Sequence, residues 1–356
     1  MGQGGARRLH LLAALCACVC CGVDGVQPPV CMTPGLPTLD DLAHKYGSGK
    51  AVKTRGGSAT VKQTRTDGGG HGFAHGYARA LERHRQHVTR VMEFGVFFGA
   101  SILMWRDYFP HAQVVGVDTF AGQLGHGPRF SNATIFLDLW RAGKVGERIH
   151  LIQADQSEAA ELDRVIREAD AAVPADEPAP SGPCAAVAER GMFDLIVDDA
   201  SHRMRDQQLT LAATFARLKP CGIYVLEDIH TSLQAQYHVR GGMTTLAMIE
   251  QFERGAGFNE SKHVTARQAE YLNRWVEGCV RIVPRGGRSV LSQTAICYKR
   301  AVPLPVGWSQ LDPTPPPTPA ELATRMRLYA PDEYTVGDPS HYLRVRLESR
   351  CTLTHE

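Results

Sequence analysis

Apolar runs of strand length alternate with amphipathic stretches through the middle of the chain. Five runs rich in Val, Ile and Phe have strand character, and stretches with helical spacing lie between them, such as 99–109, 157–169 and 205–219. The five predicted strands are 90–97, 112–120, 148–155, 193–199 and 222–228. This alternation predicts an α/β fold with a doubly wound, mostly parallel sheet and helices on both faces.

Shorter patterns flank this α/β unit. Two helices separated by a polar, Gly-rich loop are predicted within 38–90, as an N-terminal helical cap. Two strands joined by a Gly-Gly turn are predicted within 278–300, as a C-terminal antiparallel hairpin at the sheet edge. We therefore expect a main domain at 91–300 with an Ala- and Pro-rich insertion at 170–191, followed by a Pro-rich linker and a peripheral tail at 301–356.

The first 25 residues have the layout of a secretory signal peptide, because Arg7 and Arg8 precede a run of about 15 apolar or small residues. An uncleaved signal anchor is the alternative, and no stable membrane span is expected beyond this segment. The sequons at Asn132 and Asn259 agree with a glycoprotein. The predicted location is the secretory pathway, in the ER or Golgi lumen or outside the cell.

Overall charge and cysteine spacing exclude some functions. With 39 basic and 37 acidic residues, the net charge of +2 gives no broad attraction for nucleic acid or an anionic membrane. No CxxC spacing indicates zinc among the cysteines beyond the leader, which we expect to be mostly buried thiols. These cysteines are Cys31, Cys184, Cys221, Cys279, Cys297 and Cys351.

The first predicted strand ends in the turn EFGVFFGAS, which carries Glu93, Gly95, Gly99 and Ser101. This turn is not the dinucleotide pattern GxGxxG, because Phe97 stands where the second glycine would let a pyrophosphate approach. The carboxylate of Glu93 would also repel a diphosphate. Both features favour a cationic ligand such as S-adenosylmethionine (SAM).

Acidic residues also end the next two predicted strands. Asp118 stands where a carboxylate would accept hydrogen bonds from ribose hydroxyls, and Asp155 where one would accept from the adenine amino group. A lone carboxylate at a strand end is often a helix N-cap instead. Three such residues on three consecutive strands, counting Glu93, favour the adenosyl ligand.

The fourth and fifth predicted strands end in DDASH and ED, and neighbouring parallel strands bring their carboxyl ends to one crevice. Crowded carboxylates repel one another, and a hard divalent cation such as Mg²⁺ relieves that repulsion. We expect Asp199, Glu227 and Asp228 to bind the metal, with Asp198 on the cofactor side.

His202 follows Asp199 by three residues and is the candidate general base. A neutral imidazole beside a cation can accept a proton from a metal-bound hydroxyl. The alternative is a histidine that caps the next helix while the carboxylates pair with Arg203 or Arg205.

Several of these segments, in order along the chain, resemble class I SAM-dependent methyltransferases related to the Mg²⁺-dependent macrolide-sugar O-methyltransferases of the mycinamicin type. The resemblance covers 39–232 and rests on LAHKYGSGK, HGYARALERH, VMEFGVFFGASILMWRDYFPHAQVVGVD, QADQSE, FDLIVDDASH and LKPCGIYVLEDIHTS. It implies the same metal ligands, the same base at His202, and SAM contacts from Glu93, Asp118 and Asp155.

Three departures from the family pattern concern the acceptor more than the chemistry. Ala200 replaces a usual Gly, Cys221 replaces the first Gly of PGG, and Leu233 replaces a frequent Tyr. We expect Mg²⁺-assisted O-methyl transfer from SAM to a hydroxyl of a sugar or glycosylated metabolite, with the acceptor lid between Ser232 and Val276. A phenolic or polyketide acceptor, a non-catalytic binding protein on the same scaffold, and a homo-oligomer remain open.

Overall fold

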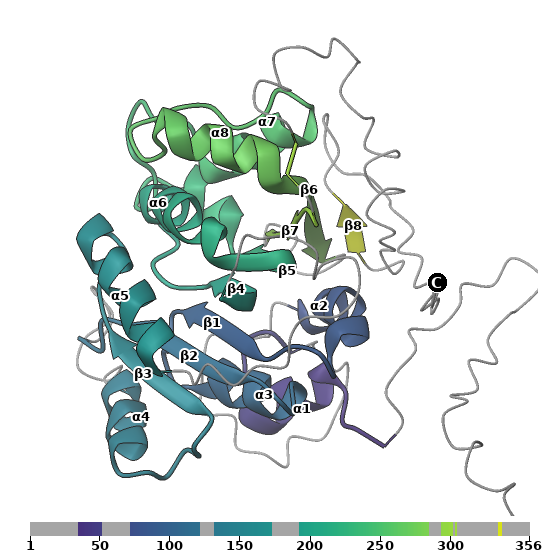
Figure 1. Ribbon diagram of the computed structural model, residues 1–356, viewed down its shortest axis with the longest axis vertical. Coiled ribbons are helices and arrows are strands. Elements are labelled where there is room, and N and C mark those ends of the chain that lie inside the picture. Colours follow the sequence, from purple (N-terminus) through teal and green to yellow (C-terminus); the bar gives the residue numbers. More distant parts are fainter. Residues whose placement is uncertain are drawn as a thin grey trace, which may run out of the picture.

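The computed structural model places one β-sheet between two layers of helices (Figure 1). It describes residues 35–51, 72–121, 132–172, 192–284, 293–301, 303–304 and 334–336. The predicted signal segment, the Gly286-Gly287 turn and most of the predicted insertion lie outside these ranges. Among the helices described, none has the length and apolar character needed to cross a bilayer.

Eight strands form the sheet in the order β3-β2-β1-β4-β5-β7-β6-β8. The first five strands are parallel, and β7 runs antiparallel to both β5 and β6. The strands are β1 (Arg90–Phe94), β2 (Gln113–Asp118), β3 (Ile149–Gln153), β4 (Phe193–Asp198), β5 (Leu218–Leu226), β6 (Val276–Pro284), β7 (Thr294–Lys299) and β8 (Tyr334–Val336). The predicted doubly wound sheet and its C-terminal hairpin are thus confirmed. The strand order reverses between β1 and β4, where such sheets bind ligands.

Two hydrophobic cores lie on opposite faces of the sheet. One core is covered by α1 (Leu39–Tyr46), α2 (Ala74–Leu81), α3 (Ala100–Tyr108) and α4 (Asn132–Arg141). The other is covered by α5 (Ala159–Ala172), α6 (Met204–Thr214), α7 (Thr245–Glu253) and α8 (Ala266–Trp275). Because both faces are covered, the strands are apolar on both sides and only their ends are free for chemistry.

The ends of α1 direct the following chain toward the sheet. Thr38 caps the helix in a reciprocal pair with Asp41, and Gly47 ends it in the left-handed conformation with φ 69°. The backbone N–H of Ala74, at the start of α2, then donates to the carbonyl of Lys50 at 2.9 Å. This short segment is therefore fixed at both ends, with the Lys50 side chain buried.

Helix α4 was not predicted from the sequence. Its apolar positions Ala133, Phe136, Leu137 and Trp140 have helical spacing, and the first three are buried. The indole N–H of Trp140 donates to the carbonyl of Ile149 at 2.7 Å, which ties α4 to β3. Exposed Ile and Leu side chains on the same helix blur its amphipathic pattern.

The acceptor lid expected between Ser232 and Val276 stays a prediction. Within that range, helices α7 and α8 bury Leu246, Ile249 and Leu272 in the core on their face of the sheet. Within the tail, which is expected to be peripheral, β8 adds a short antiparallel strand at the outer edge of the sheet beside β6. Helix α5 also extends to Ala172, into the predicted insertion.

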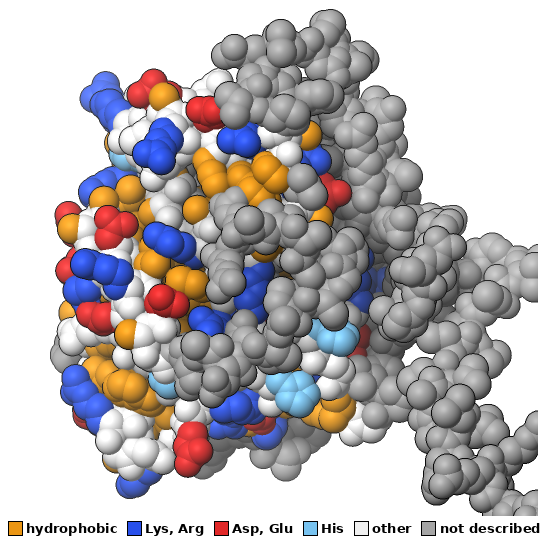
Figure 2. Space-filling view, in the orientation of Figure 1, with side chains coloured by type: hydrophobic (Ala, Val, Ile, Leu, Met, Phe, Trp, Pro, Cys, Tyr) orange, Lys and Arg blue, Asp and Glu red, His pale blue; other side chains and the backbone are white. Residues whose placement is uncertain are grey.

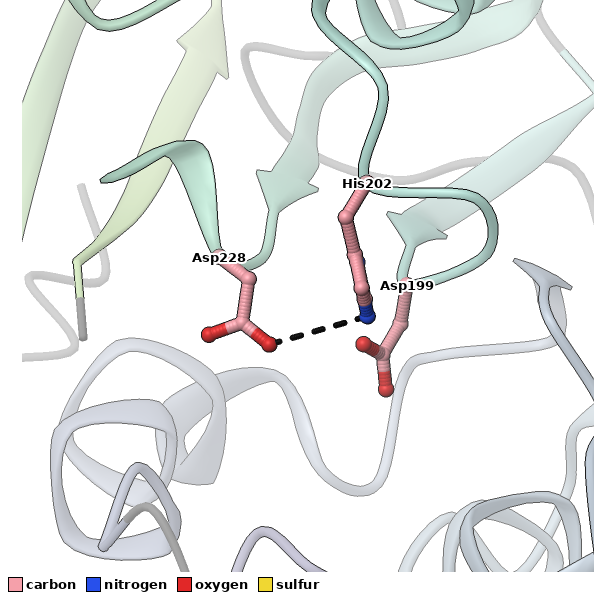
Figure 3. A group of neighbouring side chains, drawn as sticks. All are labelled: Asp199, His202 and Asp228. Atoms are coloured by element: carbon pink, nitrogen blue, oxygen red, sulfur yellow. Dashed lines mark ion pairs between the residues drawn. The ribbon is translucent and has the colours of Figure 1, made fainter. Parts of the chain in front are cut away.

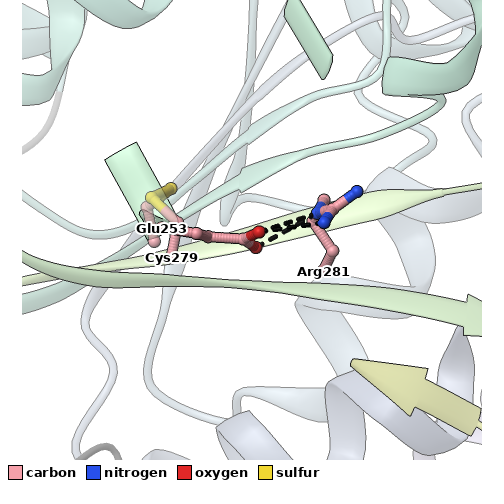
Figure 4. Close-up of a disulfide and its surroundings, with 4 residues drawn as sticks. Glu253, Cys279 and Arg281 are labelled. Atoms are coloured by element: carbon pink, nitrogen blue, oxygen red, sulfur yellow. Dashed lines mark hydrogen bonds and ion pairs between the residues drawn. A yellow bond between two sulfur atoms is a disulfide. The ribbon is translucent and has the colours of Figure 1, made fainter. Parts of the chain in front are cut away.

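A disulfide joins Cys279 of β6 to the directly opposite Cys297 of β7 (Figure 4). The expectation of mostly buried thiols is wrong for these two residues and for Cys221, which is also disulfide-bonded. Strand pairing explains the bond, because residues opposite each other in an antiparallel ladder have Cβ atoms about 5 Å apart. The spacing of 18 residues along the sequence gave no such signal.

Beside the disulfide, a buried ion pair ties the hairpin to α7. Arg281 is 1% exposed, and its guanidinium lies 2.9 Å from Glu253 (Figure 4). It also lies 2.7 Å from Glu250. Two carboxylates compensate the cost of burying this charge. The hairpin is therefore anchored both to β5 and to the helix layer.

We expect the double variant Cys279→Ala/Cys297→Ala to unfold more easily than the wild type by about 3 kcal/mol, because the bond restricts the unfolded chain. Urea unfolding under oxidising conditions measures this difference. Reductant is unsuitable, since it would also reduce the disulfide of Cys221. A variant within about 1 kcal/mol of the wild type would contradict the expectation.

The surface in view in Figure 2 mixes charges of both signs. Lys and Arg side chains alternate with Asp and Glu side chains over the described residues of this face. Such mixing matches the small net charge of +2. Partners must therefore be inferred from the site at the strand ends.

Candidate active site

The pairing of β4 with β5 brings the two acidic strand ends together. Asp198 is in register with Leu226, so Asp199 and Glu227 leave adjacent strands at the same level. The N–H of Glu227 donates to the carbonyl of Asp198 at 2.9 Å. The N–H of Asp199 donates to the carbonyl of Phe94, also at 2.9 Å, which ties the site to β1. The carboxyl ends of three strands therefore frame one pocket.

Asp199, His202 and Asp228 point into the same space (Figure 3). Their ligand atoms lie within 4.8 Å of one another, and the imidazole Nε2 is 3.8 Å from Asp228 Oδ2. His202 and Asp228 both adopt left-handed backbone conformations, with φ 56° and 51°. Non-glycine residues hold such conformations at a cost of order 1–3 kcal/mol, and they cluster at functional sites.

The backbone of the DDASH loop is fixed by hydrogen bonds rather than by a histidine cap. The Thr231 hydroxyl donates to the carbonyl of His202 at 2.8 Å. Arg203 is the N-cap residue of α6, so the alternative of His202 as a helix cap is wrong. Arg205 donates to the carbonyl of Ser157. The imidazole is thus left facing the acidic pocket.

A buried lysine that was not predicted lies on the other side of Asp199. The Lys50 Nζ is 2.6 Å from Asp199 Oδ2, 2.6 Å from Glu227 Oε1 and 3.3 Å from Glu93 Oε1. Glu93, Asp199 and Glu227 form a second group with ligand atoms within 4.8 Å of one another. Asp199 belongs to both groups, so it links the lysine side of the pocket to the histidine side.

Burial and charge act in opposite directions on these groups. Burial alone would lower the pKa of Lys50, but the carboxylates of Asp199, Glu227 and Glu93 raise it well above its usual value. Burial raises the pKa of Glu93, and it raises the pKa of Glu227 well above the ordinary range together with repulsion from Asp199. Lys50 opposes both increases. The pocket therefore contains more carboxyl groups than one ammonium group can balance in their ionised form.

The residues present fit a hard divalent cation. Glu93, Asp199, Glu227 and Asp228 supply carboxylate oxygens, which Mg²⁺ prefers. The predicted ligands do not form one tight group, however, because Asp199 neighbours Asp228 on one side and Glu227 on the other. An ion between these strand ends would relieve the repulsion that Lys50 leaves unbalanced.

The predicted cofactor residues of strands two and three already have backbone partners. Asp118 accepts hydrogen bonds from the N–H groups of Val96 (2.9 Å), Phe97 (3.1 Å) and Phe120 (2.9 Å). Asp155 is exposed and accepts from the N–H of Ser157 at 2.9 Å. Asp118 therefore shapes the turn after β1, and Asp155 holds the loop before α5, although neither is the helix N-cap considered for such carboxylates. Their contact with an adenosyl ligand stays a prediction.

The two glycines of the turn after β1 permit close packing. Gly95 has φ +96°, and a Cβ there would lie 2.2 Å from the carbonyl oxygen of Asp199. Gly99 is the N-cap residue of α3 with φ +76°, and a Cβ there would lie 2.2 Å from the ring of Phe136. Ser101 lies in the first turn of α3, where it lowers the pKa of Glu93 against the effect of burial. These residues bring β1, β4 and α4 together, whatever ligand they contact.

Asp198 and His230 complete the surroundings. Asp198 is 1% exposed, and burial raises its pKa to about 7. The ring of His230, which was not predicted, has its Nδ1 atom 3.8 Å from Asp228 Oδ1. His230 follows ED by two residues, so its proximity to Asp228 could have been inferred from the sequence.

Lys50 lies 149 residues before Asp199, and only the fold shows the contact between these two residues.

Of the residues that differ from the family pattern, Ala200 is not among those with positive φ, so its Cβ is tolerated. Cys221 does have positive φ, 64°, where Gly is favoured. Leu233 is 65% exposed beyond the site.

Comparison with known proteins gives sequence relatives with one kind of activity. The chain is 30% identical over 173 residues to mycinamicin VI 2''-O-methyltransferase of Micromonospora griseorubida, covering 45% of this chain and 33% of the relative. It is 26% identical over 258 residues to L-olivosyl-oleandolide 3-O-methyltransferase of Streptomyces antibioticus, covering 69% and 52%. The chain thus spans a third to a half of the length of these relatives. No protein-family model matches the chain.

Among solved structures, the MycE methyltransferase from the mycinamycin pathway, in complex with Mg and SAH, aligns with a TM-score of 0.48 and 21% identity. The alignment covers 78% of this chain and 58% of that chain. The doubly wound sheet and its antiparallel C-terminal strands are those expected of the class I methyltransferase fold. In sequence, the chain is similar over part of its length to O-methyltransferases whose names specify glycosylated macrolide and tetracenomycin metabolites.

Proposed function

We propose that the protein is a SAM-dependent, Mg²⁺-assisted O-methyltransferase that acts on a hydroxyl of a sugar or glycosylated metabolite. The observation that carries the proposal is the convergence of Asp199, His202 and Asp228 at the carboxyl ends of β4 and β5. The sequence relatives supply the acceptor class, since their names specify sugar hydroxyls on macrolides and tetracenomycins.

His202 is the proposed general base. The acceptor oxygen bonds to the methyl carbon as the carbon–sulfur bond of SAM breaks, and the hydroxyl proton passes to the imidazole. Thr231 holds the backbone of His202 through a hydrogen bond. Asp228 Oδ2 lies 3.8 Å from the Nε2 atom of His202, where its carboxylate would stabilise the imidazolium. Positive charge on the sulfonium makes the methyl group reactive, so the protein mainly aligns the reactants.

Asp199 and Asp228 would hold the metal, while Glu227, the third predicted ligand, faces Lys50. When bound, Mg²⁺ would lower the pKa of an acceptor hydroxyl beside it and neutralise the charge among the carboxylates. On the other side of Asp199, the ammonium group of Lys50 compensates part of the negative charge of Asp199 and Glu227. The turn after β1, which Asp118 holds and which follows Glu93, is the proposed position of SAM.

We also propose that the protein folds in an oxidising compartment. The Cys279–Cys297 disulfide supports this proposal, because such bonds persist in the secretory pathway and outside cells but are rare in the cytosol. The Arg-led apolar N-terminus is consistent with such a destination.

Incubation of the purified protein with methyl-labelled SAM and a panel of glycosylated metabolites, free glycans and phenols tests the function. We expect label on a sugar-bearing acceptor, loss of transfer after chelation, and recovery when Mg²⁺ is restored. Label only on phenols would contradict a sugar acceptor and indicate a phenolic acceptor instead. Calorimetry that shows no heat with SAM or its demethylated product would instead favour a non-catalytic binding protein.

A further inference from the structure

The acidic pocket contains two positions for a cation that share one residue. Asp199, His202 and Asp228 form the first position, and Glu93, Asp199 and Glu227 form the second. In both, the ligand atoms lie within 4.8 Å of one another. Carboxylates dominate both positions, so residue type alone does not decide which one a metal ion would take.

Lys50 distinguishes the two positions. Its Nζ contacts all three carboxylates of the second position, at 2.6, 2.6 and 3.3 Å, and its side chain is 3% exposed. A lysine at the surface would contribute little, because water screens it and its side chain is mobile. Here the ammonium is desolvated and can only be compensated by the three carboxylates around it.

The segment that carries Lys50 is anchored independently of these contacts. Gly47 ends α1, the N–H of Ser48 donates to the carbonyl of Ala43 at 2.8 Å, and the carbonyl of Lys50 accepts from Ala74 at 2.9 Å. Helices α1 and α2 are packed in the core of that face of the sheet. The ammonium is therefore delivered to the pocket by a fixed backbone rather than by a loose side chain.

We propose that Lys50 is a positioning residue whose ammonium group permanently occupies the Glu93–Asp199–Glu227 position, so that the pocket takes one divalent cation, beside Asp199 and Asp228. This inference rests on the proposed metal-dependent function. A monovalent ammonium can neutralise part of the charge without competing for the hydrated, octahedral arrangement that Mg²⁺ requires. It also holds Asp199 Oδ2 and Glu227 Oε1 against one partner, which fixes the side chains of two neighbouring strands.

Counting bound ions tests the proposal without reference to turnover. Mn²⁺ serves as the probe, and its stoichiometry is measured by calorimetry and by the loss of the free-ion magnetic resonance signal. We expect one Mn²⁺ per chain for the wild type and two for Lys50→Met, whose second position is left with three uncompensated carboxylates. Lys45→Met is the matched control, because Lys45 lies in the last turn of α1, is 56% exposed and pairs with Asp107.

A double variant separates a new ion position from general loosening. Lys50→Met/Glu93→Gln should return to one Mn²⁺ per chain, since one carboxylate of the second position is lost. Because Lys50→Met binds a second ion in its folded state, its thermal midpoint should rise with Mn²⁺ concentration more steeply than that of the wild type. One ion in Lys50→Met, or two in the wild type, would overturn the role of Lys50. A wild type that binds no ion would instead overturn the metal-dependent function.

Discussion

The variants His202→Ala and Asp199→Asn are each expected to lower methyl transfer by about a thousandfold or more while leaving SAM binding nearly unchanged. His202 is the proposed proton acceptor, and no other imidazole in the described part of the chain shares its place among Asp199 and Asp228. Asp199 contacts Lys50 and belongs to both acidic groups, so the asparagine variant disturbs both cation positions. We therefore expect the larger loss from Asp199→Asn.

Initial rates with methyl-labelled SAM at saturating Mg²⁺ give the loss of turnover, and calorimetry gives the affinity for SAM. His111→Ala is the matched control, because His111 is an exposed imidazole between α3 and β2. Transfer that survives in both site variants would contradict the base and metal mechanism. A parallel loss of SAM binding would show that the residues support the fold of the pocket instead.

The sequence predicted those parts of the fold that depend on local periodicity. Five apolar runs became β1 to β5, and carboxylates at the ends of β1, β4 and β5 converge because parallel strands share one edge. Asp199 and Glu227 could be paired from the sequence because both follow adjacent strands directly. Only residues whose positions are set by the sheet itself can be placed in this way.

Contacts outside this logic could not be predicted. Lys50 reaches the pocket because Gly47 turns the chain and Ala74 fixes it, and neither feature is visible as a periodic pattern. The Cys279–Cys297 pair depends on the exact register of the hairpin, which the spacing of 18 residues does not define. The carboxylate of Asp118, which is predicted to contact ribose hydroxyls, accepts backbone hydrogen bonds from the turn after β1, and the strand pattern does not predict these bonds.

The close approach of β1 and β4 sets the position of Asp199, and Gly95 makes that approach possible. Its φ of +96° disfavours any side chain. A Cβ there would lie 2.2 Å from the carbonyl oxygen of Asp199 and 2.9 Å from the Cα of Ala200. Both neighbours are backbone atoms of the DDASH loop, so no side chain can rotate away. The structure can accept a methyl group here only by moving the loop that carries Asp199 and His202.

Gly95→Ala should therefore destabilise the fold by about 3 kcal/mol or more, well beyond the roughly 1–2 kcal/mol that the left-handed conformation alone costs. Urea unfolding followed by circular dichroism measures the difference. Gly143→Ala is the control, because Gly143 also has positive φ, +69°, but a Cβ there would meet nothing within 4 Å. If the two variants lose equal stability, the contact between β1 and the DDASH loop is looser than the structure places it, and Asp199 is not held by Gly95.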